Sequence, residues 1–388
     1  MKVSIRTNGA SSEAEASLDH IQDGSIVVQL FTSQPIPTIE AIQLVGISST
    51  STEWKLKPVR ASISENGIPA GSSDYSLKAR IPLADMSLPN VLSSAEVSVS
   101  FTLTGIPVSA PYFNGLTQPF TVDVSGYAFS FTAANRSEVS HVVSVTGITY
   151  GSVDDVTEKL QQICWLVSFA TGSLCGMRSL EVYVGRDCVR RCLFDVTQLF
   201  ETQPYVIPAE DMSQFLTTAS PQFSRLSLAY NLPALIHLSL LAKREDITNV
   251  KALIMGNWLE ILRYQFAYNV GVPNGYYKYH PNNDTFDDAR TRRRATFQDI
   301  LTAFTKSHNI SGWTTDFKDL RNTVMHTGAL NLPILDLIPQ YKLLHHFCDR
   351  VILALLDWDK QTGRYIPYDN PVLMGPQQFG PNILTFVR

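Results

Sequence analysis

The chain has 388 residues, 44% of them hydrophobic and 17% charged, which is enough for two or three globular domains and excludes a disordered protein. Its net charge is −4 with neutral histidines, which excludes nucleic-acid binding through a large overall positive charge but leaves a local basic groove open. The first 150 residues hold 8 Lys+Arg and 12 Asp+Glu, against 23 and 23 in the rest, so the negative excess lies in the N-terminal part.

The N-terminal segment has no apolar run of the kind that a signal peptide needs, and no window reaches the ~18 apolar residues of a membrane span. We therefore expect a cytoplasmic protein with no membrane partner. The five cysteines are odd in number and lack zinc-ligand spacing, so we expect free thiols, no metal and no cofactor. On the last predicted helix Cys348 faces the core while His345 and Asp349 face away, so they are not expected to share a metal ion.

Residues 1–150 are rich in Ser, Thr, Val, Ile and Pro, and apolar residues alternate with polar ones in short runs. Such runs occupy Ser25–Phe31, Glu96–Leu103 and Ala128–Thr132, with turn residues between them. Alternation with a period of two is typical of strands that bury one face, so this part is predicted to be an all-β sandwich or barrel. No residue pattern in it points to catalysis, and we interpret it as a sensor or recognition domain.

Residues 151–220 are predicted to be a mixed α/β connecting segment. An acidic pair that can cap a helix precedes a helical pattern at Val156–Cys175, and a β-hairpin is predicted over Leu180–Leu193. Arg190 and Arg191 on that hairpin fit either a phosphate contact or a solvated strand edge, and we favour the strand edge.

Residues 221–360 show helical periodicity. The predicted helices are Leu226–Lys243, Val250–Val270, Phe297–Phe304, Phe317–Ala329 and Tyr341–Trp358. Pro233 must lie in the first turns of the first helix or kink it. Successive amphipathic helices predict an all-α bundle, so the chain as a whole is predicted to be α+β, with a proline-rich connection over 200–222 and an extended tail at 361–388.

The segment Asp316–Leu330, DFKDLRNTVMHTGAL, holds the residues that point to chemistry. As a helix it places Phe317, Leu320, Val324 and Gly328 on a core-facing stripe, and Asp319, Asn322, Thr323 and His326 on the opposite side. Asn322 and His326 are four residues apart, close enough for their side chains to touch. Arg321 stands ~140° around the helix from His326, so the two meet only if the arginine wraps round or if two copies complete each other's site across a two-fold axis.

Arg321, Asn322 and His326 match the signature R-N-x-x-x-H, and residues 221–359 resemble the HEPN superfamily of helical ribonucleases and nucleotide-binding modules. A β-rich region before such a bundle resembles the ApeA-type bacterial antiphage defence proteins. The resemblance implies a toxic endoribonuclease that acts in abortive infection on RNA, with tRNA among its candidate substrates. It also implies a homodimer or higher even oligomer joined through the bundle, and a phage-derived trigger sensed by residues 1–150.

Cleavage of RNA by attack of a ribose 2′-hydroxyl on the adjacent phosphate needs a proton acceptor and a positive charge. His326 is the candidate acceptor, since an imidazole titrates near neutral pH, and Arg321 is the candidate ligand for the phosphate. The resemblance implies that Asn322 holds the imidazole or the ribose, with Asp319 and Glu260 as supporting residues.

A structural interpretation of the same residues stays open. The arginine of the motif would then reach from the edge of the core into solvent, while the asparagine and histidine lie on an exposed face without a catalytic role. Glu260 would pair with Arg263 or Tyr264 on its own helix. The alternative function is a non-catalytic HEPN scaffold for dimerisation or nucleotide binding, and a third is a lectin-like or phage-protein-binding β module.

A tyrosine-rich insertion at Asn269–Thr296 supplies the candidate RNA-binding residues Tyr276, Tyr277, Tyr279, Arg290, Arg292, Arg293 and Arg294. Aromatic rings for stacking on bases, beside guanidinium groups for phosphate, are what a groove for single-stranded RNA requires. The same insertion holds Asp284, Asp287 and Asp288, so mutual neutralisation of charge is an equal alternative.

Overall fold

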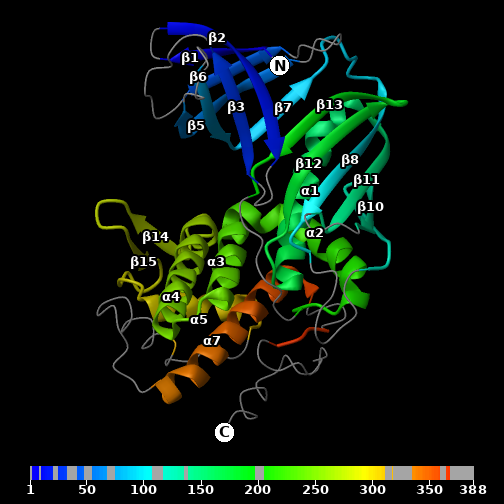
Figure 1. Cartoon of the computed structure of the whole chain (residues 1–388). Helices are drawn as coiled ribbons and strands as arrows, with labels where there is room; N and C mark the ends of the chain where they lie inside the picture. Colours follow the sequence, from blue (N-terminus) through cyan, green and yellow to red (C-terminus); the bar gives the residue numbers. More distant parts are fainter. Residues whose placement is uncertain are drawn as a thin grey trace. The chain divides into compact units, whose positions relative to one another are not determined.

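The computed structural model describes residues 2–7, 10–20, 25–32, 42–47, 55–67, 75–106, 117–134, 139–196, 205–310, 317, 334–358 and 364–367. The chain divides into two compact units (Figure 1), of which Met1–Ile106, Thr117–Cys164 and Cys175–Leu199 form the sheet unit, and Pro107–Leu116, Trp165–Leu174 and Phe200–Arg388 form the helical unit. A large antiparallel sheet in the N-terminal half and helices in the C-terminal half confirm the predicted α+β class.

Six strands of the sheet unit pair in a closed ring. They are β1 (Lys2–Thr7), β2 (Ala10–His20), β3 (Ile26–Thr32), β4 (Ile42–Ile47), β5 (Lys55–Gly67) and β6 (Tyr75–Ile81). All neighbours are antiparallel, in the order β1-β2-β3-β6-β5-β4 and back to β1. Ile26, Val28 and Leu30 on β3 are buried while Val27 and Gln29 are half-buried, as period-two alternation requires. Closure gives each of these strands a partner on both sides.

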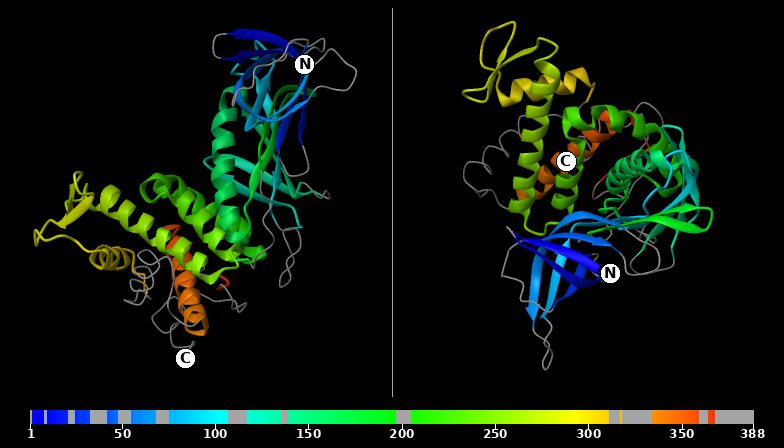
Figure 2. Two further views of the ribbon diagram at one scale, coloured as in Figure 1. Left: turned by 60° about the vertical axis from the view of Figure 1, so that its left-hand side comes forward. Right: turned by 90° about the horizontal axis from the view of Figure 1, so that it is seen from above.

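The remaining strands of the sheet unit extend from this ring. They are β7 (Leu83–Ser87), β8 (Glu96–Thr104), β9 (Phe120–Val124), β10 (Tyr127–Ala133), β11 (His141–Thr149), β12 (Gly176–Val184) and β13 (Asp187–Phe194). Their order is β7-β13-β12-β8-β11-β10-β9, and β7 also pairs with β5. Helix α1 (Val153–Thr171) follows β11 after one 3₁₀ turn and runs beside these strands (Figures 1 and 2). Strand β13 is therefore an inner strand, flanked by β7 and β12.

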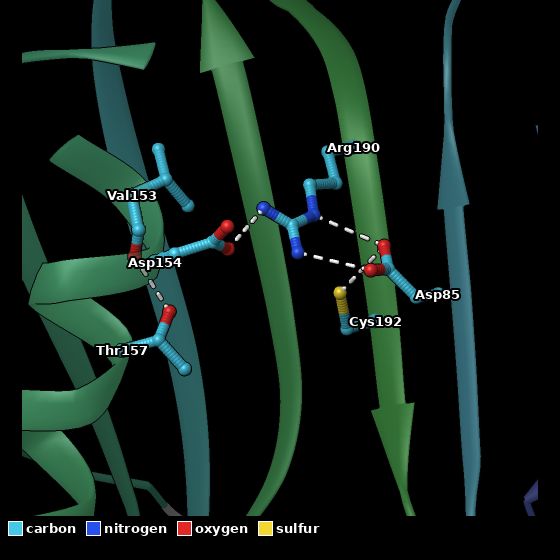
Figure 3. Close-up of polar contacts among 6 residues, drawn as sticks. All are labelled: Asp85, Val153, Asp154, Thr157, Arg190 and Cys192. Atoms are coloured by element: carbon cyan, nitrogen blue, oxygen red, sulfur yellow. Dashed lines mark hydrogen bonds and ion pairs between the residues drawn. The ribbon is translucent and has the colours of Figure 1, made fainter. Parts of the chain in front are cut away.

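Arg190 on β13 forms an ion pair with the buried Asp85 on an inner strand, so its prediction as part of a solvated strand edge is wrong (Figure 3). Its Nε and Nη2 atoms donate to the two carboxylate oxygens of Asp85 on β7, at 3.0 and 2.9 Å, and Nη1 donates to Asp154 on α1 at 2.7 Å. The thiol of Cys192 donates to Asp85 at 3.1 Å, and burial raises the pKa of that thiol to about 12. Arg191 does face solvent, where its guanidinium pairs with Glu181.

We predict that Arg190→Gln destabilises the protein by roughly 3–5 kcal/mol, because the substitution leaves the Asp85 carboxylate, 5% exposed, as a buried charge without its guanidinium. The matched control is Arg191→Gln on the same strand, which removes an exposed pair and is expected to cost less than ~1 kcal/mol. Urea unfolding of the three proteins measures both changes. Equal losses for the two variants would contradict a special role for the buried pair.

The helical unit contains most of the predicted helices. Its elements are α2 (Met212–Tyr230), α3 (Leu232–Arg244), α4 (Thr248–Gln265), the π-helix η3 (Phe266–Gly271), the strands β14 (Tyr277–His280) and β15 (Thr285–Asp288), α5 (Phe297–Ser307) and α7 (Ile334–Leu355). The helix predicted at Val250–Val270 corresponds to α4 and η3, and the one at Phe297–Phe304 to α5. Pairs of helices that are in contact include α3 with α4 and α4 with α7, so the unit is built on helix packing.

The prediction of a single helix over Leu226–Lys243 is wrong. Leu226–Lys243 is two helices, because Asn231 adopts a left-handed backbone with φ 53° between α2 and α3, and Pro233 lies in the first turn of α3. Helix α2 also starts at Met212 and includes Pro221, within the stretch that was predicted to be a connection. The prolines of residues 200–222 predicted a connection, but the buried apolar residues of α2 pack as one helix through Pro221.

The core of the helical unit holds charged and titratable groups. The Lys243 ammonium on α3 contacts both carboxylate oxygens of Asp349 on α7, at 3.3 and 3.2 Å, and the two side chains are 3% and 2% exposed. Burial raises the pKa of Asp349, and the Lys243 ammonium opposes that rise. The prediction that His345 and Asp349 face away from the core is therefore wrong, since α7 buries them together with Cys348.

Residues 364–367 pack on the helical unit. The Ile366 amide donates to the carbonyl of Val206 at 2.7 Å, and Trp358 donates its indole N–H to the carbonyl of Arg364 at 2.8 Å. The Tyr365 hydroxyl and His346 Nε2 are hydrogen-bonded at 3.1 Å, and burial lowers the pKa of His346 to about 4. This short piece of the predicted tail therefore covers apolar surface.

We predict that His346→Gln makes the helical unit less sensitive to acid. The folded imidazole has a pKa of about 4 and an unfolded one has ~6.5, so the unfolded state binds more protons between these values and stability falls as pH drops through that window. Glutamine keeps a hydrogen-bonding group for Tyr365 without a titrating charge. Urea unfolding at pH 7 and pH 4.5 should show the wild type losing roughly 2 kcal/mol more than the variant. A parallel loss in both proteins would contradict the assignment.

Candidate functional site

The residues of the predicted motif, Asp319, Arg321, Asn322 and His326, lie outside the described residues. Phe317, two residues before them, is described. It is helical and 2% exposed, and its ring lies 5.6 Å from the ring of Phe347 on α7. The first residue of the predicted apolar stripe is therefore packed in the core of the helical unit.

Glu260, predicted to support the motif, lies on α4. Its carboxylate accepts a hydrogen bond at 2.9 Å from Nε of Arg263, one turn further along the same helix, and both side chains are about 20% exposed. The intrahelical pairing that was the alternative for this residue is therefore present.

The tyrosine-rich insertion is a folded β-hairpin that follows α4 through the π-helix η3. Strands β14 and β15 are antiparallel and extend beyond the end of α4 (Figure 2). At the base of the hairpin the Tyr277 ring packs onto Gly271, where a Cβ atom would lie 2.3 Å from the ring, and the Tyr276 amide donates to the Gly271 carbonyl at 2.8 Å. Phe286 on β15 is 1% exposed and packs on Tyr277 and Tyr279. One face of the hairpin is thus a small apolar core.

The predicted base-stacking tyrosines divide by exposure. Tyr276 is 53% exposed, but Tyr277 is 7% exposed, so the prediction that Tyr277 stacks on a base is wrong. Tyr279 is half-buried, and its hydroxyl donates to Asp284 at 2.9 Å. Sequence reasoning missed Tyr268 on η3, which is 43% exposed, stacks on Tyr264 at 5.7 Å and meets the edge of Tyr279 at 5.1 Å. The four-residue spacing of Tyr264 and Tyr268 on one helix was the available signal.

The aspartates of the insertion accept hydrogen bonds from backbone amides, a tyrosine and a histidine, and no guanidinium group of the insertion is among the donors. Asp288 accepts from the backbone N–H groups of Arg290 and Thr291, at 2.9 and 2.7 Å, and these bonds hold the pKa of its carboxyl below the usual value. Asp287 is hydrogen-bonded to His280 at 2.9 Å. Arg290, Arg292, Arg293 and Arg294 are all exposed, and no ion pair in the described part of the chain involves them. The charge of Arg290 also lowers the pKa of Asp288, so neutralisation, the alternative for this loop, acts there without an ion pair.

Backbone hydrogen bonds fix the turn that carries the arginines. The Asp288 amide donates to the Arg293 carbonyl and the Arg292 amide to the Asp288 carbonyl, both at 2.8 Å, with Arg292 left-handed at φ 54°. Arg294 forms an isolated antiparallel β-bridge, through its backbone, with Asp287 on β15, and the following helix α5 starts with a capping box between Thr296 and Asp299. We call residues 276–294 the arginine hairpin.

We predict that Gly271→Ala destabilises the helical unit by roughly 1–3 kcal/mol, because the new methyl group clashes with the Tyr277 ring and displaces the base of the arginine hairpin. Tyr277→Ala removes the ring that the methyl group meets. Adding Gly271→Ala to that variant should therefore cost much less than it does in the wild type, and urea unfolding of all four proteins completes the cycle. Additive losses would show that the contact does not constrain the hairpin.

No group of three His, Cys, Asp or Glu side chains in the described ranges is placed to hold a metal ion. No helix among the described residues has the length and apolar character to cross a membrane. A scan against protein-family models, a search of curated proteins and a search of solved structures each found no match.

Proposed function

We propose that the protein is a metal-independent endoribonuclease of the HEPN type. The observation that carries the proposal is the Arg321-Asn322-x-x-x-His326 motif within the predominantly helical C-terminal part of the chain. Burial of Phe317 against Phe347 supports it, because the predicted polar side of the motif helix is opposite that apolar stripe.

In the proposed reaction His326 accepts the proton of a ribose 2′-hydroxyl. The 2′-oxygen then bonds to the adjacent phosphorus and the bond from phosphorus to the 5′-oxygen breaks, which yields a 2′,3′-cyclic phosphate and a 5′-hydroxyl end that takes up a proton. Arg321 stabilises the negative charge that grows on the phosphate oxygens, since a guanidinium matches them with two parallel hydrogen bonds. Asn322 holds the imidazole or the ribose in place.

The proposal includes a second copy of the chain. On one straight helix Arg321 and His326 stand ~140° apart, so a two-fold pairing in which each copy supplies one of the two groups brings them to a common phosphate. A homodimer or a higher even oligomer joined through the helical unit is therefore part of the proposed enzyme.

The proposed biological role is a toxic effector of bacterial antiphage defence, active in the cytoplasm. The β-rich sheet unit that precedes the helical unit would sense a phage-derived trigger, and RNA, with tRNA as one candidate, would be the target. The order of the units along the chain supports this role.

We predict that the purified protein cleaves tRNA or total RNA in EDTA, and that His326→Ala and Arg321→Ala each reduce the rate at least ~100-fold, because each removes a group needed in the transition state. Thr323→Ala is the matched control on the polar side of the same segment and should retain activity. Denaturing gels measure cleavage, and circular dichroism shows that the variants fold.

Mixing the two inactive variants tests the shared site. If Arg321 of one copy and His326 of the other form each site, a mixed dimer keeps one intact site, so random exchange restores about a quarter of wild-type activity. No recovery after exchange would place both groups within one chain. Intact RNA at enzyme excess, with and without extract of phage-infected cells as a source of trigger, would instead assign a non-catalytic scaffold.

A further inference from the structure

We propose that the arginine hairpin is a binding site for single-stranded RNA, in which guanidinium groups hold phosphates and exposed tyrosines stack on bases. The choice of RNA as ligand rests on the proposed function, whereas the site itself rests on the described residues of the hairpin. Neither Arg321 nor His326 belongs to it.

The first argument is that the hairpin has more positive than negative charge and that its guanidinium groups are not held in ion pairs among the described residues. Four arginines are exposed with no ion pair in the described part of the chain, and the carboxylates around them are engaged by other donors: Asp284 by Tyr279, Asp287 by His280, and Asp288 by two backbone amides. With Lys278, the hairpin holds five cationic side chains against these three carboxylates, a net charge of 5 − 3 = +2 in a protein of net charge −4. A phosphate chain is the class of ligand that such free guanidinium groups recognise.

The second argument is that the cationic groups are presented on a rigid support. The 288–293 turn is closed by two backbone hydrogen bonds of 2.8 Å, and the Ala295 amide donates to the Phe286 carbonyl at 2.8 Å. The apolar face of the hairpin is anchored by Tyr277 on Gly271. Residues opposite each other in adjacent strands share a face, so Arg294, Asp287 and Lys278 lie on the face opposite to Phe286. A preorganised set of donors loses little freedom when it binds a ligand.

The third argument is that exposed aromatic rings accompany the charge. The Ala289 amide donates to the Tyr276 carbonyl at 3.0 Å, which places the 53% exposed Tyr276 next to the arginine turn. Tyr268, 43% exposed, extends the Tyr264 and Tyr279 cluster at the foot of the hairpin, on its Phe286 face. Unpaired bases offer flat faces for such rings, whereas the bases of a duplex are already stacked, so the combination favours a single strand.

The test measures RNA binding apart from cleavage. Full-length protein with His326→Ala is titrated into a fluorescent single-stranded uridine oligomer in EDTA. Replacing Arg290, Arg292, Arg293 and Arg294 by glutamine should weaken binding roughly 10- to 100-fold and lower the slope of log affinity against log salt by ~0.7 for each phosphate that the variant no longer binds. Tyr276→Ala and Tyr268→Ala should each weaken it by roughly tenfold.

The matched control is Arg186→Gln with Arg225→Gln and Arg244→Gln, which removes three exposed positive charges from other surfaces and should change affinity less than about threefold. Circular dichroism and urea unfolding confirm that the exposed substitutions leave the fold intact. Affinity that is equal for the four-glutamine variant and the parent overturns the proposal. Equal binding of duplex RNA or polyglutamate, insensitive to the tyrosine substitutions, also overturns it.

The outcome is separable from that of the proposed enzyme. If the wild type cleaves RNA and the hairpin variants bind and cleave normally, the hairpin proposal fails and the enzyme stands. If the hairpin binds single-stranded RNA as expected but neither wild type nor any activated form cleaves it, the binding site stands and the nuclease proposal fails.

Discussion

A buried charge must have a partner, and this constraint decides which basic residues of the chain are structural. The buried Asp85 carboxylate is paired with Arg190, and the buried Lys243 ammonium is paired with Asp349. In each case an uncompensated charge in the interior would cost several kcal/mol, so two elements distant in sequence are held in register. Strand β7 is tied to β13 in one unit, and α3 to α7 in the other.

The same constraint separates the arginine hairpin from the rest of the molecule. Its guanidinium groups are in water, where an absent partner costs nothing, and they remain available to a ligand. Its carboxylates are used to close the turn and to hold Tyr279 and His280. The buried side chains of Tyr277 and Phe286 pack the hairpin onto the rest of the helical unit. Lys278 and the four arginines carry its positive charge.

The proposed enzyme needs both catalytic groups at one phosphate and a means to hold the RNA. A helix separates side chains that are five residues apart by ~140°, which is why the proposed site includes a second copy of the chain. A cation surface on a separate hairpin complements such a site, because binding of remote parts of a substrate supplies free energy to position the reacting part. Cleavage and binding are then the tasks of different residues of one unit.

The sequence by itself determined the class of each half: period-two alternation marked the strands, and helical periodicity marked α4, α5 and most of α7. It also supplied the motif at Arg321 and His326, because a motif is local. Tertiary structure decided which polar and aromatic residues face water. Arg190 is paired with Asp85 because β7 lies beside β13, and Tyr277 is buried because Gly271 leaves room for its ring. Which of these residues are buried depends on contacts between separate segments of the chain, and periodicity within one segment does not predict such contacts.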